Sequence, residues 1–226
     1  VKGEILVIDD GSTDNTKNLL KQYKNSNLEY FRYLINYKNL GISKTRNKLV
    51  KNAKGKYIIF IDSDVIPSNN MIKEHLKILT KKENIISQGS LILIPNLEEI
   101  NTKKFNPFTD FSNASFDTAN VGVEKSKIEK VGFFDENFSG YGWEDLELGL
   151  RLQKIGLNKI KNKKALAYHV QPYIESDNLT LLKEKEKQRA IGSIYFVKKH
   201  PFYQVKTMTQ YYKYNFVLNW VFYMIF

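Results

Sequence analysis

The chain of 226 residues contains no cysteine, which excludes disulfide bonds, thiolate metal sites and catalysis by a cysteine nucleophile. No secretory signal stands at its start. It also lacks a dense block of basic residues and any RNP-type or comparable motif, so we expect no nucleic-acid partner. The net charge of +11 is spread along the chain and favours attraction to anions such as nucleotides or an anionic membrane face.

Long apolar runs are also missing, apart from residues 216–226. These eleven residues are too few to cross a bilayer, which takes about 20. The tail is compatible with an interfacial helix, a packing helix or the start of a longer membrane segment. The rest of the chain, with 42% hydrophobic and 26% charged residues overall, predicts one folded domain without repeats or linkers. Because the first residue is valine, we expect the natural start to lie upstream.

The first feature that points to a function is an apolar run at residues 57–61, which ends at two carboxylates. Five large apolar residues in a row predict a strand buried on both faces, and Asp62, Ser63 and Asp64 follow it directly. In open α/β sheets, ligands bind at the carboxyl ends of the strands. Paired carboxylates there suit a divalent cation that carries a phosphorylated ligand. Taken alone, an Asp-x-Asp is equally compatible with a surface turn.

A second strand, predicted at residues 4–8, also ends in carboxylates, Asp9 and Asp10. Strands and helices then alternate as far as residue 94, which predicts βαβ units and a largely parallel sheet. A later strand, predicted at residues 165–170, ends near His169. The pattern indicates an α/β domain with several polar residues gathered at strand ends.

The most distinctive local run is Gly142, Trp143, Glu144 and Asp145. Glycine gives a loop backbone freedom, and the acidic residues then open a helix. The positive end of a helix dipole favours ionised carboxylates, so we expect both acids to be ionised and of limited basicity.

Three further polar residues are expected to be structural. Glu147 and Arg151 are four residues apart on the same predicted helix, which favours an ion pair. His75 falls on the apolar face of another predicted helix. We therefore expect it beside the core rather than at a metal.

Five segments, taken in chain order, resemble the signature of family 2 glycosyltransferases with the GT-A fold. They are residues 5–14 (ILVIDDGSTD), residues 39–41 (NLG) with Arg46 and Asn47, residues 62–64 (DSD), residues 131–136 (VGFFDE) and residues 142–145 (GWED). Each segment is weakly specific alone, but their order and spacing together indicate the family. The last two are most similar to chondroitin polymerases and β-1,4-galactosyltransferases.

The resemblance covers residues 1–170 and implies a single α/β, Rossmann-like GT-A domain, with a mostly parallel central sheet flanked by helices. We expect this domain at residues 1–200, with a nucleotide-sugar-binding half at 1–95 and an acceptor-binding, catalytic half at 96–200. Residues 201–226 would form an aromatic tail. Family members usually begin with an earlier strand whose Pro-x-Tyr-Asn-like segment contacts the nucleotide base. Since that segment is absent here, we expect the N-terminal strand to be missing.

The resemblance also implies a donor site that includes a metal ion. Asp64 is expected to bind Mn²⁺ or Mg²⁺ with His169 as a second ligand, and Asp62 to contact the ribose or the metal's water shell. The other residues expected at the donor site are Asp9, Asp10, Asn39, Gly41, Arg46 and Ser63. We expect only one of the adjacent aspartates, at positions 9 and 10, to touch the ligand. The arginine is interpreted as a cationic fork for the nucleotide, or else as a surface charge.

On the acceptor side, the resemblance assigns Asp145 as the catalytic base and Glu144 as the residue that holds acceptor hydroxyls. Trp143, which follows the loop residue Gly142, offers a flat face for a sugar ring, although ordinary core packing explains it equally well. These residues complete the site that the sequence predicts.

We therefore expect a cytoplasmic, metal-dependent inverting hexosyltransferase of polysaccharide biosynthesis. It would move a sugar from a nucleotide-sugar, UDP-sugar by resemblance, to a hydroxyl of a glycan, lipid-linked or protein acceptor. The C-terminal tail is a candidate for peripheral contact with the inner face of the membrane. One alternative is a GT-A relative that binds sugar nucleotides without turnover, or transfers with retention. The other is a phospho-accepting receiver domain, which should contain a Lys-Pro pair that this chain lacks.

Overall fold

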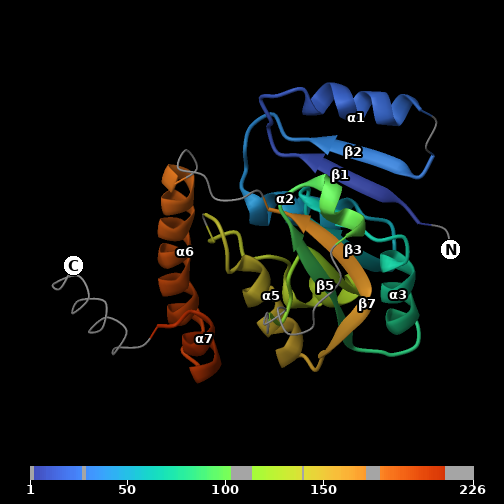
Figure 1. Ribbon diagram of the computed structural model, residues 1–226. Helices are drawn as coiled ribbons and strands as arrows, with labels where there is room; N and C mark the ends of the chain where they lie inside the picture. Colours follow the sequence, from blue (N-terminus) through green and yellow to red (C-terminus); the bar gives the residue numbers. More distant parts are fainter. Residues whose placement is uncertain (1–2, 27–28, 103–113, 139, 172–178, 212–226) are drawn as a thin grey trace. The chain divides into compact units, whose positions relative to one another are not determined.

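The computed structural model in Figure 1 describes residues 3–26, 29–102, 114–138, 140–171 and 179–211. The chain forms two compact units. The first comprises Val1–Glu136 with Glu144–Ile174, and the second comprises Asn137–Trp143 with Glu175–Phe226. Both sheets and all the expected donor-site residues belong to the first unit.

The first unit begins with alternating strands and helices and then becomes less regular. Its elements in chain order are β1 (Ile5–Asp9), α1 (Thr16–Asn25), β2 (Phe31–Ile35), α2 (Ile42–Asn52), β3 (Tyr57–Ile61), β4 (Val65–Pro67), α3 (Met71–Leu79), β5 (Ile85–Ile94), the 3₁₀ helix η1 (Leu97–Asn101), β6 (Asn120–Glu124), α4 (Lys125–Val131), α5 (Glu144–Lys154) and β7 (Asn158–Val170). Strand β3 lies where the sequence predicts it.

The strands form two sheets rather than one mostly parallel sheet. Strands β1 and β2 pair in parallel and α1 lies along them (Figure 1). The second sheet has five strands in the order β3-β6-β5-β7-β4. In that sheet only β5 and β7 pair in parallel; the other three pairings are antiparallel. A parallel pairing needs a long crossover. Here β6 pairs antiparallel with both of its neighbours and β4 pairs antiparallel with β7, so the prediction of a mostly parallel sheet was wrong in this respect.

The main apolar core contains three phenylalanines that meet edge to face. Phe60 of β3 lies with its ring centroid 5.8 Å from that of Phe116 and 5.7 Å from that of Phe134. Such pairs add to the free energy gained from burial, and truncation of a buried phenylalanine to alanine costs about 3–5 kcal/mol. Because Phe60 precedes the carboxylate turn and Phe134 belongs to the loop after α4, this core fixes both segments.

A buried polar network crosses the centre of the larger sheet. His75 on α3 contacts Ser87 Oγ through Nδ1 at 2.9 Å and Asn120 Oδ1 through Nε2 at 2.8 Å. The Asn120 amide nitrogen donates to the carbonyls of Ser90 and Ala165, so its oxygen accepts and His75 Nε2 carries the proton. Burial lowers the pKa of His75, which favours this neutral form. The prediction that this histidine is structural is confirmed.

The second unit contains α6 (Leu179–Lys199) and α7 (Tyr203–Met208). Phe196 of α6 is fully buried and packs edge to face against Phe138, with ring centroids 6.1 Å apart. Within the described residues of both units, no helix combines the length and apolar character needed to cross a membrane. The predicted apolar tail at 216–226 lies outside the described residues.

Candidate functional site

Asp10 connects the end of β1 to the loop before α2. Its carboxylate accepts hydrogen bonds from Asn36 Nδ2 at 2.8 Å, from Leu40 N at 2.9 Å and from Gly41 N at 3.1 Å. Burial alone would raise the pKa of Asp10, but these hydrogen bonds outweigh it and hold the pKa below its usual value. Asp10 therefore acts on the protein's own backbone and stabilises the loop around Gly41.

The neighbouring Asp9 has one carboxylate oxygen without a hydrogen-bond partner among the described residues. Its Oδ1 accepts a hydrogen bond from Ser12 N at 2.9 Å, whereas its buried Oδ2 has no partner among the described residues. An unpaired buried carboxylate oxygen is costly, so such atoms in folded proteins often mark a ligand site. The structure thus gives the two aspartates different surroundings.

Gly11 allows these two loops to approach each other closely. Its φ of +80° is rarely adopted by residues with a side chain, and an added Cβ would lie 2.6 Å from the carbonyl carbon of Lys38. The nearby Asn39 is exposed and caps the turn through Oδ1, which accepts from Gly41 N at 3.0 Å. The glycine-containing motif therefore shapes the loop that Asp10 secures.

Arg46 on α2 joins two carboxylates. Its Nη2 lies 3.1 Å from Asp62 Oδ1 and its Nη1 lies 2.6 Å from Glu144 Oε1. Burial would lower the pKa of Arg46, but the charges of Asp62, Glu144 and Asp145 outweigh it and raise the pKa. Arg46, interpreted from the sequence as a fork for the nucleotide or as a surface charge, thus forms two ion pairs within the protein, and its contact with a nucleotide stays a prediction. Glu144 Oε2 is buried without a partner in the described chain.

Asp145 stands beside this ion-paired group at the start of α5. Its Oδ1 accepts a hydrogen bond from Leu146 N at 2.7 Å. Burial raises the pKa of Asp145 to about 8; the negative charges of Glu144 and Asp117 add to this effect, and Arg46 opposes it. The expectation that the helix dipole keeps Asp145 ionised and weakly basic was therefore wrong, because desolvation and like charge outweigh the dipole.

Asp64 and His169 converge at the edge of the larger sheet. In the antiparallel pairing of β4 and β7, Val65 lies opposite His169, which places the preceding aspartate beside the imidazole. His169 Nε2 and Asp64 Oδ2 are 3.2 Å apart, and the Asp64 side chain is 56% exposed. Ser63 is exposed in the same turn. This carboxylate–imidazole pair is open to solvent on the aspartate side.

The other expected metal ligand, Asp62, faces Arg46. Among the side chains that the structure describes, no group of three or more histidine, aspartate or glutamate residues is arranged to hold a metal. A cation at the pair formed by Asp64 and His169 would therefore need further oxygen ligands from phosphate or water. A role for Asp62 in the metal's water shell stays a prediction.

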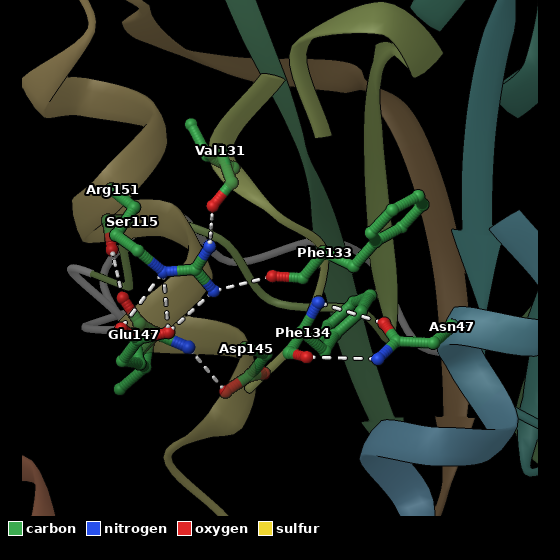
Figure 2. A network of polar contacts seen from close by, with 9 residues as sticks. Asn47, Ser115, Val131, Phe133, Phe134, Asp145, Glu147 and Arg151 are labelled. Carbon is green, nitrogen blue, oxygen red and sulfur yellow. Dashed lines mark hydrogen bonds and ion pairs between the residues drawn. The ribbon is translucent and has the colours of Figure 1, made fainter. Parts of the chain in front are cut away.

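The loop between α4 and α5 is fixed by side chains from two helices, as Figure 2 shows. Asn47 donates from Nδ2 to Phe134 O at 2.9 Å and accepts from Phe134 N at 2.8 Å, like a neighbouring strand. Arg151 donates to Phe133 O at 2.6 Å and pairs with buried Glu147 at 2.7 Å. The predicted ion pair between Glu147 and Arg151 is confirmed, and this network holds the start of α5.

Gly142 and Trp143 belong to the second unit. The indole Nε1 of Trp143 donates to Arg189 O at 2.7 Å, and the Arg189 guanidinium lies 5.5 Å from the ring centroid. Gly192 makes room for the ring, since a Cβ there would lie 3.0 Å from Trp143 Cδ1. Packing against α6 therefore accounts for Trp143, and a sugar-stacking role stays a prediction.

Residues 2–130 match the family model described as Glycosyl transferase family 2. The chain belongs to this family. It is 26% identical to a chondroitin synthase of Escherichia coli, in a match that covers 84% of this chain and 32% of that protein. It spans 32%, 53% and 22% of the length of three curated relatives that it matches.

Solved structures show the same GT-A fold. A mannosyltransferase of Pyrobaculum calidifontis, solved with GDP-Man and Mn²⁺, has a TM-score of 0.64 at 12% identity, over 86% of this chain and 55% of that one. The structure of GalNAc-T7 with UDP, GalNAc and Mn²⁺ has a TM-score of 0.62 at 15% identity, over 75% of this chain and 38% of that one. The predictions of the family and of the GT-A α/β fold are confirmed.

One carboxylate at the site of this family 2 chain was not anticipated. Asp117 follows a segment that gave no periodic pattern, so nothing in the sequence distinguished it from a loop residue. Burial raises the pKa of Asp117; the charge of Asp62 adds to this effect, and His169 and Arg46 oppose it. Only the pairing of β6 with β3, which was not predicted, could have placed Asp117 beside the carboxylate turn.

Proposed function

We propose that this family 2 chain transfers a monosaccharide from a UDP-sugar to a hydroxyl group of a glycan or glycoconjugate, with inversion and with Asp145 as the base. The observation that carries the proposal is the environment of Asp145, whose pKa is raised to about 8. A general base is most effective when its pKa lies near the working pH. An aspartate with an ordinary pKa would be a poor proton acceptor for an alcohol. The raised pKa of Asp145 reduces the difference in pKa between the base and the alcohol.

The donor is proposed to bind along the loops that follow β1, β2 and β3. Asp9, with its unpaired Oδ2, is the candidate acceptor for a hydrogen bond from the nucleoside. Asp10 instead holds the loop around Gly41 in place for the ligand. The UDP in the structure of GalNAc-T7 supports UDP as the nucleotide.

A divalent cation is proposed at Asp64 and His169. The donor set fits, because a carboxylate oxygen and an imidazole nitrogen 3.2 Å apart can bind one ion, and the exposed aspartate leaves room for phosphate oxygens. When bound, the cation would act as a Lewis acid that stabilises the negative charge of the leaving diphosphate. The Mn²⁺ in both solved relatives supports this assignment.

The reaction is then a single displacement. The acceptor hydroxyl gives its proton to Asp145 while its oxygen forms a bond to the anomeric carbon of the donor sugar. The bond from that carbon to the diphosphate oxygen breaks, and its electron pair leaves with UDP. Arg46 keeps Glu144 in place beside the base through their 2.6 Å ion pair, so that Glu144 Oε2 is free for an acceptor hydroxyl.

The experiment is to screen UDP-sugars with Mn²⁺ or Mg²⁺ and then to compare the wild type with Asp145→Asn. The variant should bind UDP and Mn²⁺ normally while turnover falls by about 10²–10⁴, as is usual for the loss of a general base. Glu83→Gln makes the same change, from carboxylate to amide, at an exposed residue between α3 and β5 and should leave turnover unchanged. NMR of the product should show an inverted anomeric centre. A retained configuration, donor binding without any turnover, or full activity of Asp145→Asn would each contradict the proposal.

A further inference from the structure

Asp117 lies beside the carboxylate turn because of the sheet register. Strand β6 runs antiparallel to β3, and Asn120 at its start lies opposite Ile61 at the end of β3. The residues just before β6 are therefore neighbours of the residues just after β3, which include Asp62 and Asp64. Asp117 thus adds a carboxylate to the edge that carries the proposed metal site.

The backbone of Asp117 is hydrogen-bonded to the side chain of Gln88. Buried Gln88, in the middle of β5, accepts from Asp117 N at 2.8 Å and donates to Asp117 O at 3.3 Å. Asp117 Oδ1 then accepts from Ala119 N at 3.0 Å, which fixes the side chain in a tight turn. Among the described residues, none donates to the second oxygen, Oδ2. The site therefore contains a rigidly mounted carboxylate with one free acceptor.

The position of Asp117 relates it to the transferred sugar. In the proposed reaction, the anomeric carbon lies between the diphosphate, near Asp64 and His169, and the acceptor hydroxyl, near Asp145. The charges of His169 and Asp145 are both electrostatically coupled to Asp117. A carboxylate close to both groups lies beside the monosaccharide rather than beside the nucleoside.

The charges around this position are predominantly negative. Asp62, Glu144 and Asp117 lie around a single guanidinium, that of Arg46, which already pairs with the first two. Glu144 Oε2 is buried and unpaired, which adds a second free acceptor for a hydroxyl. Such surroundings suit hydroxyl groups, which donate to carboxylates, and oppose a further anion.

We propose that Asp117 Oδ2 accepts a hydrogen bond from a hydroxyl of the transferred sugar, and that this carboxylate restricts the donor to neutral hexoses or N-acetylhexosamines. A uronic acid donor would bring its own carboxylate into a group of acidic side chains. Like charges placed together cost several kcal/mol, so the preference for a neutral sugar should exceed about 100-fold. The inference rests on the proposed function and names the substrate class of the same site.

Asp117→Asn is the sharpest variant, because asparagine keeps the Oδ1 that Ala119 N needs and replaces only the free Oδ2 with an amide nitrogen. Glu83→Gln is its control, since it makes the same change from carboxylate to amide at an exposed residue between α3 and β5. Both variants are compared with the wild type in the presence of Mn²⁺. The probes are UDP, UDP-GlcNAc, UDP-GalNAc, UDP-glucose, UDP-galactose and UDP-glucuronic acid. Binding is measured by calorimetry, and turnover by release of UDP.

We expect the wild type to use at least one neutral donor and to reject UDP-glucuronic acid. In Asp117→Asn the affinity for that neutral donor should fall about 10- to 100-fold, the value of one hydrogen bond to a charged group, with UDP affinity unchanged. Relative acceptance of UDP-glucuronic acid should rise about tenfold, since one negative charge is gone. Equal losses for UDP and UDP-sugar would indicate a structural role and overturn the inference. Efficient use of UDP-glucuronic acid by the wild type would do so too.

These outcomes are separable from failure of the proposed function. If neither variant nor wild type releases UDP from any donor, the transferase proposal fails and the calorimetry still tests Asp117 as a binding residue. If the wild type turns over and Asp117→Asn behaves as Glu83→Gln does, only the inference about Asp117 fails.

Discussion

Raising the pH from 7 to 9 should increase the rate of sugar transfer about tenfold, because the change ionises Asp145. With a pKa of about 8, roughly one molecule in eleven carries the ionised base at pH 7 and ten in eleven at pH 9. Below pH 8 the logarithm of kcat/KM should therefore rise with a slope of one. An aspartate with its usual pKa would instead give a flat profile above about pH 5.

The assay is the initial rate of UDP release as a function of pH, from 6 to 9.5, at donor concentrations below KM. Under these conditions kcat/KM reports the protonation state of the free enzyme. Asp145→Asn removes the titrating base, so its residual rate should lack this limb. A wild-type rate that is flat from pH 6 to 9, or a limb that persists in the variant, would show that Asp145 is not the group that titrates.

The same pKa makes a prediction about stability that does not depend on the reaction. Because the folded pKa of Asp145 lies above its unfolded value of 3.8, the folded state binds more protons between about pH 4 and pH 8. This contribution is fully present below pH 4 and is lost as the pH rises towards 8, by at most about 1.4 kcal/mol per unit. Asparagine stays neutral, so Asp145→Asn should gain stability relative to the wild type across this range in urea denaturation. A constant difference between the two proteins would contradict the raised pKa.

Three further substitutions test the elements around the site. Asp64→Ala and His169→Ala should each abolish the Mn²⁺-dependent part of UDP binding, while UDP still binds weakly without metal. Calorimetry with and without EDTA measures this difference. If Mn²⁺ strengthens UDP binding in the variants as much as in the wild type, the two residues do not bind the metal. Asn47→Ala should lower the free energy of unfolding by about 2–4 kcal/mol, because it leaves the buried backbone groups of Phe134 without partners. Urea denaturation measures this loss. A loss below about 0.5 kcal/mol would contradict the role of Asn47 in holding the loop.

The sequence predicts elements well where the signal is local. Residues 57–61 form the expected strand, because an uninterrupted apolar run has few alternatives to a buried strand. The ion pair between Glu147 and Arg151 follows from helical spacing, which is also local. By contrast, β7 begins at Asn158 rather than near residue 165, because its first half is rich in lysine and asparagine and is recognised only through its pairing with β5.

Parts of the site could not be predicted because they depend on contacts between distant segments. The ion pair between Arg46 and Glu144 joins residues 98 positions apart, and no local pattern identifies the partner. The raised pKa of Asp145 was missed for the same reason. Helix position alone argued for an ordinary carboxylate, whereas the burial and neighbouring charges that reverse this are set by the tertiary fold.

Adjacent residues of α2 have a consequence for engineering this protein. Arg46 reaches Glu144, and Asn47 holds the loop at Phe134, so a single turn of α2 positions two segments that follow residue 130. The parts of the chain before and after residue 130 are therefore not interchangeable modules, although the family model ends there. If the second half of the chain is replaced by that of a relative, the buried guanidinium of Arg46 and the buried amide of Asn47 each need a matching partner in the new half. A chimera should fold stably only when both parent proteins have these two contacts. Where the parents differ, exchanging α2 together with the second half should restore stable folding.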